Sequence, residues 1–243
     1  MYSFNAKKYN VMISILTAFK KFRDKAGRAQ RIAIYSWKML GIPVYAVMDN
    51  EVGVQAVLSE SIEINALRGA KTGRDLGFAT GAVLLNDLIR VGLKESKTLL
   101  LGVCCGDVIL PMDFMKRMQD VVDDKGLEAF YYARKLDIKE GSYEGPSGYA
   151  DALMTPVIKT DGVGFFTMSR FNLRKMSQEM PDIIFGRDSW LDWTIKWCFS
   201  NGVTAHDVTE QLGLRHIEHD HNHIILQEGV KSKSAEHNRS FLK

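Results

Sequence analysis

Short apolar runs alternate with amphipathic stretches over the first hundred residues, and this alternation restricts the fold more than any other feature. The runs VMISIL (11–16), PVYAVMD (43–49) and KTLLLGV (97–103) predict β-strands. The stretches at 27–40 and 81–93 carry apolar residues at helical spacing and predict α-helices. Strands and helices in turn imply βαβ units, so we expect an α/β fold in which helices flank a mostly parallel central sheet. The ligand crevice of such a sheet lies beyond the carboxyl ends of its strands.

The rest of the chain has a less regular pattern. It predicts helices at 51–60, 112–122 and 189–200, strands at 62–64, 126–138, 163–170, 203–208 and 212–217, and a loop at 141–149. The sequence contains no repeat, no low-complexity tract and no interdomain linker. We therefore expect a single domain over 1–243.

Composition narrows the class of protein. The 32 basic and 29 acidic residues leave a net charge of +3, which is too small to indicate nucleic-acid binding by itself. Three cysteines, two of them adjacent, give no disulfide framework and suit a reducing cytosol. No apolar run is long enough to span a bilayer, and the first residues lack a secretory cleavage site. We therefore expect a cytoplasmic protein.

Basic residues gather in the first forty positions. Nine lysines and arginines lie between Lys7 and Lys38, with Asp24 as the only acid among them. Such a stretch can meet the phosphates of a nucleotide or a polynucleotide. A solvated helix face and loop is the simpler explanation, and both remain open.

The strand predicted at 97–103 is followed by CCGD, which sets Asp107 at the mouth of the expected crevice. A carboxylate at this place can hold a divalent cation that bridges a diphosphate. An aspartate after a strand is also a common turn former. Asp107 is thus a candidate metal ligand with a plain structural alternative.

Four histidines lie within LRHIEHDHNHI (214–224): His216, His219, His221 and His223. In an extended chain the last three share one side, and imidazole is the commonest ligand of transition metals. No Cys-x-x-Cys pair accompanies them, which argues against a closed structural zinc site. We expect one histidine to contact a catalytic metal or a phosphate and the others to lie on the surface.

Two acids within FGRDSWLDW (185–193) have structural and functional explanations. Asp188 can cap the helix predicted at 189–200, and Asp192 can pair with Lys196 one turn later. Alternatively, a carboxylate at this helix start faces a bound substrate and takes a proton from it. Both interpretations stay open at this point.

In the same segment, the tryptophans have a structural explanation, whereas the arginine indicates a nearby ligand. Trp190, Trp193 and Trp197 fall at the spacing of a core stripe on a helix. Arg187 directly precedes the expected helix start, where a cation opposes the positive end of the helix dipole. An arginine at this position is better explained by a nearby anion such as a phosphate or a carboxylate.

Five segments occur in order along the chain: AQRIAIYSWKMLGIPVYAVMDNEVG, LLLGVCCGDVIL, ARKLDI, FGRDSWLDW and HIEHDHNH. Together they resemble the nucleotide-sugar glycosyltransferases of the GT-A fold, in particular small members found in bacteria, plants and viruses. The match covers roughly residues 10–225, and five motifs in this order are fairly specific. The resemblance implies a nucleotide-binding half at about 10–110, an acceptor half at about 111–225 and a basic tail at 226–243. It also places the chain in the host cytoplasm if it is viral.

The resemblance implies a divalent metal site. Asp107 matches the acid that holds Mg²⁺ or Mn²⁺ on the donor diphosphate, and His216 and His219 match further ligands. The other acidic position of that motif is Cys105 here, and a thiol is a poor ligand for a hard cation. Either one acid suffices together with water and a histidine, or metal dependence is weakened.

The implied reaction is hexosyl or pentosyl transfer, with inversion, from a nucleotide sugar such as a UDP-sugar to an acceptor hydroxyl. Asp188 corresponds to the base that removes the acceptor proton, and Asp192 is the second choice. Contacts with the donor or its nucleotide are implied for Asp49, Arg74, Asp75, Arg134 and Arg187.

Alternatives remain open for the acceptor and for the class of protein. Saccharide, lipid and protein acceptors are ordinary for this fold, whereas some viral and kinetoplastid relatives are thought to glycosylate hydroxymethylated pyrimidines in DNA. The basic start and tail keep DNA among the candidates. A catalytically inactive GT-A module that binds only nucleotide or a partner is favoured by Cys105. A metalloprotein built on the histidine cluster is the third class.

Overall fold

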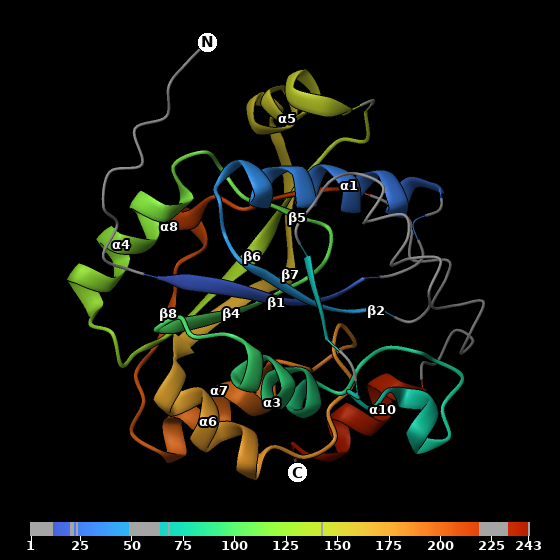
Figure 1. Ribbon diagram of the computed structural model, residues 1–243, viewed down its shortest axis with the longest axis vertical. Helices are drawn as coiled ribbons and strands as arrows, with labels where there is room; N and C mark the ends of the chain where they lie inside the picture. The colour runs from blue at the N-terminus through green and yellow to red at the C-terminus, as the bar shows by residue number, and fades with distance from the viewer. Residues whose placement is uncertain are drawn as a thin grey trace.

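The computed structural model describes residues 12–19, 22, 24–48, 64–67, 69–141, 143–218 and 233–242. These residues form one nine-stranded sheet with helices on both faces (Figure 1). The strand order is β3-β2-β1-β4-β7-β6-β9-β5, and β8 pairs with β6. No helix in these ranges is long and apolar enough to cross a bilayer.

The amino-terminal half of the sheet is parallel. Its strands are β1 (Ile13–Phe19), β2 (Val44–Met48), β3 (Ile64–Leu67) and β4 (Leu100–Cys104). Neighbouring strands among these four all run in the same direction. The carboxyl ends of these strands therefore meet at one edge of the sheet, as the alternating sequence pattern predicts.

The carboxyl-terminal half of the sheet is mixed. Its strands are β5 (Val108–Ile109), β6 (Phe130–Ile138), β7 (Val157–Ser169), β8 (Ala205–Asp207) and β9 (Arg215–Ile217). β7 runs antiparallel to both β4 and β6, and β9 lies between β6 and β5. Five of the eight pairings among the described strands are parallel, which confirms the mostly parallel sheet.

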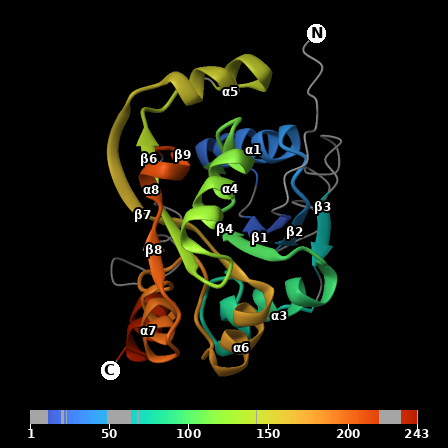
Figure 2. The same cartoon turned by 90° about the vertical axis from the view of Figure 1, so that its left-hand side faces the viewer.

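Helices cover both faces of the sheet (Figures 1 and 2). One face carries α1 (Asp24–Met39), α4 (Phe114–Lys125) and α5 (Gly145–Met154), with the short α8 (Thr209–Leu212) beside α4. The other face carries α3 (Leu85–Glu95), α6 (Arg170–Glu179) and α7 (Asp192–Ser200). The 3-10 helix η1 (Gly73–Leu76) and α10 (Lys233–Ser240) lie toward the same side. Each face has its own buried apolar core.

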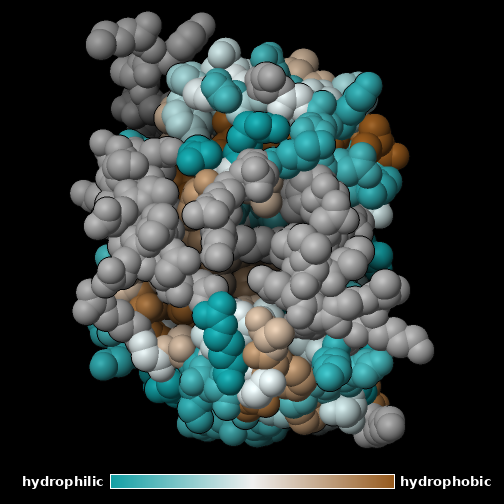
Figure 3. All heavy atoms as spheres, turned by 90° about the vertical axis from the view of Figure 1, so that its right-hand side faces the viewer, coloured by the Kyte–Doolittle hydropathy of each residue, from teal (hydrophilic) through white to brown (hydrophobic). Residues whose placement is uncertain are grey.

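Helix α1 shows how sequence spacing sets these layers. Ala29, Ile32, Ala33 and Trp37 fall at positions i, i+3, i+4 and i+8 of one helical face, and all four are buried. Lys38 lies on the exposed side of the helix. The described surface in the upper part of Figure 3, where α1 and α5 lie, is accordingly mainly hydrophilic.

The loop predicted at 141–149 is wrong in its second half, because α5 begins at Gly145. Pro146 lies in the first turn of this helix, where its missing N–H removes no helical hydrogen bond. Helix α6 was not predicted from the sequence. The side chain of Ser169 caps that helix by accepting a hydrogen bond from the backbone N–H of Asn172. The helix predicted at 51–60 lies outside the described residues.

The helix predicted at 189–200 begins later than expected. α7 starts at Asp192 and its N-cap residue is Leu191, so Asp188 does not cap it. Residues 185–191 instead form turns, and Ser189 has a left-handed φ of 62°. A helix cannot run through a residue held in that region, so the helix starts only after it.

Candidate functional site

Asp107 lies in the short turn between β4 and β5 and is 5% exposed. The next residue, Val108, pairs antiparallel with His216 of β9. This register brings the His216 ring beside Asp107, with Nε2 of the ring 3.7 Å from Oδ2 of the carboxylate. Two of the three predicted metal ligands therefore lie together, and the third, His219, lies outside the described residues.

A second carboxylate, absent from the predicted site, holds the other side of the His216 ring. Asp137 of β6 pairs in register with His216 of β9, and its Oδ1 lies 2.7 Å from Nδ1 of the ring. Lys159 of β7 places its ammonium 3.5 Å from Oδ2 of Asp137 and 2.9 Å from Glu218. The sequence signal for Asp137 was its place in the ARKLDI segment, but only the strand register shows its partner.

The electrostatics of this cluster favour a positively charged imidazole. Burial opposes protonation of His216, but the carboxylates of Asp107 and Asp137 outweigh it, so the pKa of His216 is raised. The hydrogen bond to Glu218 likewise raises the pKa of Lys159. A positive charge on the ring is therefore stabilised between the two buried carboxylates.

The fit to a divalent cation follows from the spacing of the two donor atoms. With metal–ligand bonds of about 2.0 to 2.2 Å, two ligand atoms of one ion lie roughly 3 to 4 Å apart. The 3.7 Å between Asp107 Oδ2 and His216 Nε2 falls in that range. The described part of the chain contains no cluster of three or more ligating side chains. The spacing of this pair therefore fits two ligands of one ion, with no third protein ligand among the described residues.

The segment after Asp107 is held rigidly by α1 and α5. The indole of Trp37 donates a hydrogen bond to the carbonyl oxygen of Val108 at 3.0 Å. The backbone N–H of Leu110 donates to Ser36, and the hydroxyl of Tyr149 donates to the carbonyl oxygen of Leu110. These buried contacts fix the strand that positions the candidate ligand.

Arg187 is buried rather than placed at a helix start. Only 7% of the residue is exposed, and its guanidinium donates to Thr80 at 2.8 Å and to Ser234 at 3.2 Å. It therefore joins the loop before α3 to the start of α10. The premise that this arginine opposes the dipole of an adjacent helix is wrong, because α7 begins only at Asp192.

Asp188 points to solvent. Its side chain is 78% exposed and lies 3.4 Å from the guanidinium of Arg239. Asp192 is exposed in the first turn of α7, where its charge suits the helix dipole. Lys196 donates to the carbonyl oxygen of Leu242 at 3.3 Å, and the described residues show no ion pair between it and Asp192.

The tryptophans of this region pack as their spacing predicts. Trp190 and Trp197 are buried in the core that contains α3, α6 and α7, and Trp193 packs against that core while partly exposed. Trp190 contacts the rings of Phe166 and Phe185. The predicted packing is therefore confirmed for Trp193 and Trp197 on α7, whereas Trp190 is buried in the turn before that helix.

The two candidate groups are not joined by direct contacts. No hydrogen bond or ion pair between described residues links Arg187 or Asp188 to Asp107 or His216. The flanking residues lie in different cores, since Val108 belongs to the core beneath α1 and Phe185 to the core beneath α3. Convergence of both groups on one donor remains a proposal.

The remaining candidate residues have local partners or lie outside the described chain. Asp75 accepts hydrogen bonds from the backbone N–H and hydroxyl of Thr72, and the backbone contact lowers the pKa of Asp75. Arg74 is exposed on the same 3-10 helix. Arg134 lies 3.7 Å from Asp207. Asp49 lies outside the described residues.

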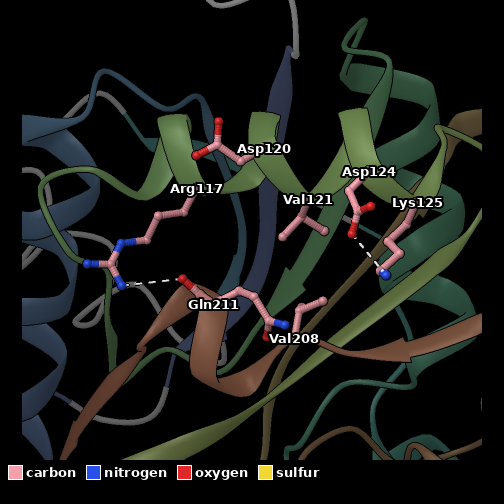
Figure 4. A pocket seen from close by; sticks show the side chains of 7 residues that line it. All are labelled: Arg117, Asp120, Val121, Asp124, Lys125, Val208 and Gln211. Atoms are coloured by element: carbon pink, nitrogen blue, oxygen red, sulfur yellow. Dashed lines mark hydrogen bonds and ion pairs between the residues drawn. The ribbon is translucent and has the colours of Figure 1, made fainter.

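A surface hollow between α4 and α8 is separate from all these residues (Figure 4). It has a volume of about 300 Å³ and is lined by Arg117, Asp120, Val121, Asp124, Lys125, Val208 and Gln211. Arg117 closes one end by donating to the backbone oxygen of Gln211. None of its lining residues is a candidate for the predicted chemistry.

Comparisons with solved structures support the fold, whereas comparisons of sequence give no match. No family model and no curated protein matches the sequence. The structure resembles the inositol-1-phosphate CTP transferase from T. maritima, with a TM-score of 0.50 and 11% identity, over 92% of this chain and 97% of that one. It also resembles the 4-diphosphocytidyl-2C-methyl-D-erythritol synthase from Anaerococcus prevotii, with a TM-score of 0.50 and 11% identity, over 97% and 100%. The chain thus has the nucleotide-diphospho-sugar transferase fold that the motif resemblance implies.

Proposed function

We propose that the chain is a metal-assisted glycosyltransferase that moves a sugar from a nucleoside-diphosphate sugar to an acceptor hydroxyl. The observation that carries this proposal is the pair formed by Asp107 and His216, whose donor atoms lie 3.7 Å apart after the carboxyl end of β4. A parallel sheet binds ligands at that edge. The fold and the five sequence motifs support the same class of substrate.

The residues divide the work of a direct displacement. Asp107 and His216 would hold a divalent cation, Mn²⁺ or Mg²⁺, which would offset the charge that grows on the departing diphosphate. Asp188 accepts the proton of the attacking hydroxyl, and Asp192 is the alternative base. Arg187 contributes positive charge on the side of α10. A single displacement inverts the anomeric centre.

Release of nucleoside diphosphate tests the proposal. The chain is incubated with a panel of nucleotide sugars and Mn²⁺, with water or a simple acceptor present. Asp107→Ala should abolish the release. Asp113→Asn is the matched control, because this nearby acid is exposed and paired with Arg117 on α4. Binding of nucleotide sugar without any release would instead identify a catalytically inactive binding module.

Nucleotidyl transfer is the second candidate. The names of both similar structures refer to CTP or to a diphosphocytidyl compound, which favours this reaction class. The products separate the two candidates, because nucleotidyl transfer releases pyrophosphate from CTP in the presence of a sugar phosphate. Pyrophosphate from that mixture, with no nucleoside diphosphate from nucleotide sugars, would replace the first proposal by the second.

DNA that carries hydroxymethylated pyrimidines is an acceptor that needs its own test. The basic residues of α1 give this acceptor limited support, because Lys25 and Arg28 both pair with the carboxylate of Glu140, which offsets their charge. Binding to duplex DNA should fall steeply with added salt if basic residues follow the phosphate backbone. Absence of binding at low salt would leave a saccharide, lipid or protein as the acceptor.

A further inference from the structure

We infer that Asp137 is a positioning residue, which fixes the His216 ring in the tautomer and orientation that turn Nε2 toward Asp107. The inference rests on the proposed function, because it concerns how the same metal site is prepared. It adds a residue on a third strand, β6, to the pair formed by the turn after β4 and by β9. The cluster thus spans three elements that are far apart in the sequence.

The hydrogen bond between Asp137 and His216 decides the tautomer. Oδ1 of Asp137 lies 2.7 Å from Nδ1 of His216, and both side chains are almost fully buried, at 1% and 2% exposure. An ionised carboxylate only accepts hydrogen bonds, so Nδ1 carries the proton. In the neutral ring Nε2 then keeps its lone pair, which is the form that ligates a metal ion.

The ring cannot easily take another orientation. His216 pairs with Asp137 in the parallel register of β6 and β9, and with Val108 in the antiparallel register of β5 and β9. Its backbone is therefore fixed from both sides. A ring held between Asp137 on one nitrogen and Asp107 on the other has the arrangement in which a second carboxylate orients a ligating histidine.

Lys159 and Glu218 complete the support. Lys159 lies opposite Asp137 in the pairing of β6 with β7, and its ammonium stands 3.5 Å from the oxygen of Asp137 that does not bind His216. Glu218 contacts the same ammonium at 2.9 Å. The cation offsets the charge of the buried Asp137 carboxylate, which lets it remain an acceptor for Nδ1–H.

Mn²⁺ affinity is the first test, measured on the full chain by the electron paramagnetic resonance signal of unbound Mn²⁺. Asp137→Ala should weaken binding about 10- to 100-fold, the usual cost of losing a carboxylate that orients a ligating histidine. Asp137→Asn should lose less Mn²⁺ affinity, because the amide oxygen of the asparagine can still accept a hydrogen bond from Nδ1–H of His216. Asp87→Asn is the matched control, since Asp87 is also buried and paired with a cation, Arg90, but lies on α3.

The tautomer itself is the second test, and it does not depend on metal. Long-range ¹H–¹⁵N spectra of the wild-type chain at alkaline pH should show His216 protonated on Nδ1. An Nε2–H tautomer in the wild type would overturn the inference, even if Asp137→Ala failed to fold. Mn²⁺ binding by Asp137→Ala within about twofold of the wild type would also overturn it. Failure of the wild type to bind Mn²⁺ would overturn the proposed metal site, a result distinct from either.

Discussion

His216 stands between two buried carboxylates, with Nδ1 2.7 Å from Asp137 and Nε2 3.7 Å from Asp107. The three residues come from β6, from β9 and from the turn between β4 and β5. A buried imidazole with a carboxylate beside each nitrogen favours a positive charge on the ring.

The Mn²⁺-dependent part of the stabilisation by a donor should require Asp107. At about 100 times the dissociation constant, a nucleotide sugar with Mn²⁺ should add about 2.7 kcal/mol of stability, or roughly 5 to 11 °C in Tm. A thermal-shift assay measures the effect. Asp107→Ala should remove the Mn²⁺-dependent part, whereas Asp113→Asn should keep it. An unchanged shift in Asp107→Ala would exclude this carboxylate from the metal site.

The exposed acids Asp188, before α7, and Asp192, in its first turn, should differ in their effect on turnover. Asp188→Ala should lower kcat by about 10² to 10⁴-fold, because a general base contributes that much, with little change in the KM of the donor. The fold should tolerate the change, since the Asp188 side chain is 78% exposed. Steady-state kinetics with saturating acceptor make the measurement. A loss confined to Asp192→Ala would assign the base to Asp192 instead.

Trp37→Phe should destabilise the segment that follows Asp107. The substitution removes the buried hydrogen bond from the indole to the carbonyl oxygen of Val108. We expect a loss of about 1 to 3 kcal/mol in the free energy of unfolding, measured by urea denaturation. Trp193→Phe is the control, because that indole makes no hydrogen bond among the described residues and is only partly buried. Equal losses in the two variants would contradict the prediction.

Gly106→Ala should disturb the turn that carries Asp107. A Cβ at this position would lie 2.9 Å from Cδ1 of Phe19 and 3.1 Å from the carbonyl oxygen of Ala18, so the turn has to shift. Overpacking of this kind costs about 1 to 3 kcal/mol, and we expect weaker Mn²⁺ binding with it. Gly162→Ala has open space around the new Cβ and should stay within about 0.5 kcal/mol of the wild type. Wild-type Mn²⁺ affinity in Gly106→Ala would count against a site at Asp107.

Local patterns in the sequence were sufficient to predict the class of fold. The apolar runs near 11–16, 43–49 and 97–103 all became strands, and 27–40 became a helix, because each pattern reflects burial on one or both sides of its own element. The patterns were weaker where local preferences conflicted. Gly, Pro and Ser at 141–149 indicated a loop, yet Pro146 suits the first turn of a helix equally well.

Asp188 shows a different limit of prediction from the sequence. Its residue type favours an N-cap, and the sequence offered no reason to place the helix start elsewhere. Tertiary contacts decided the outcome, because Arg187 is buried against Thr80 and Ser234 while Trp190 packs into the core. With both neighbours fixed, the chain turns through Ser189 at a φ of 62° before the helix begins.

The sequence by itself determined that the chain is an α/β protein with Asp107 after a buried strand and a histidine-rich segment far downstream. Only the tertiary structure decided that His216 meets Asp107, and that Asp137, 79 positions earlier, holds the other nitrogen of its ring. The reason is physical. The register of β9 against β5 and β6 depends on pairing between distant strands, and the hydrophobic periodicity of a single strand does not encode its neighbour.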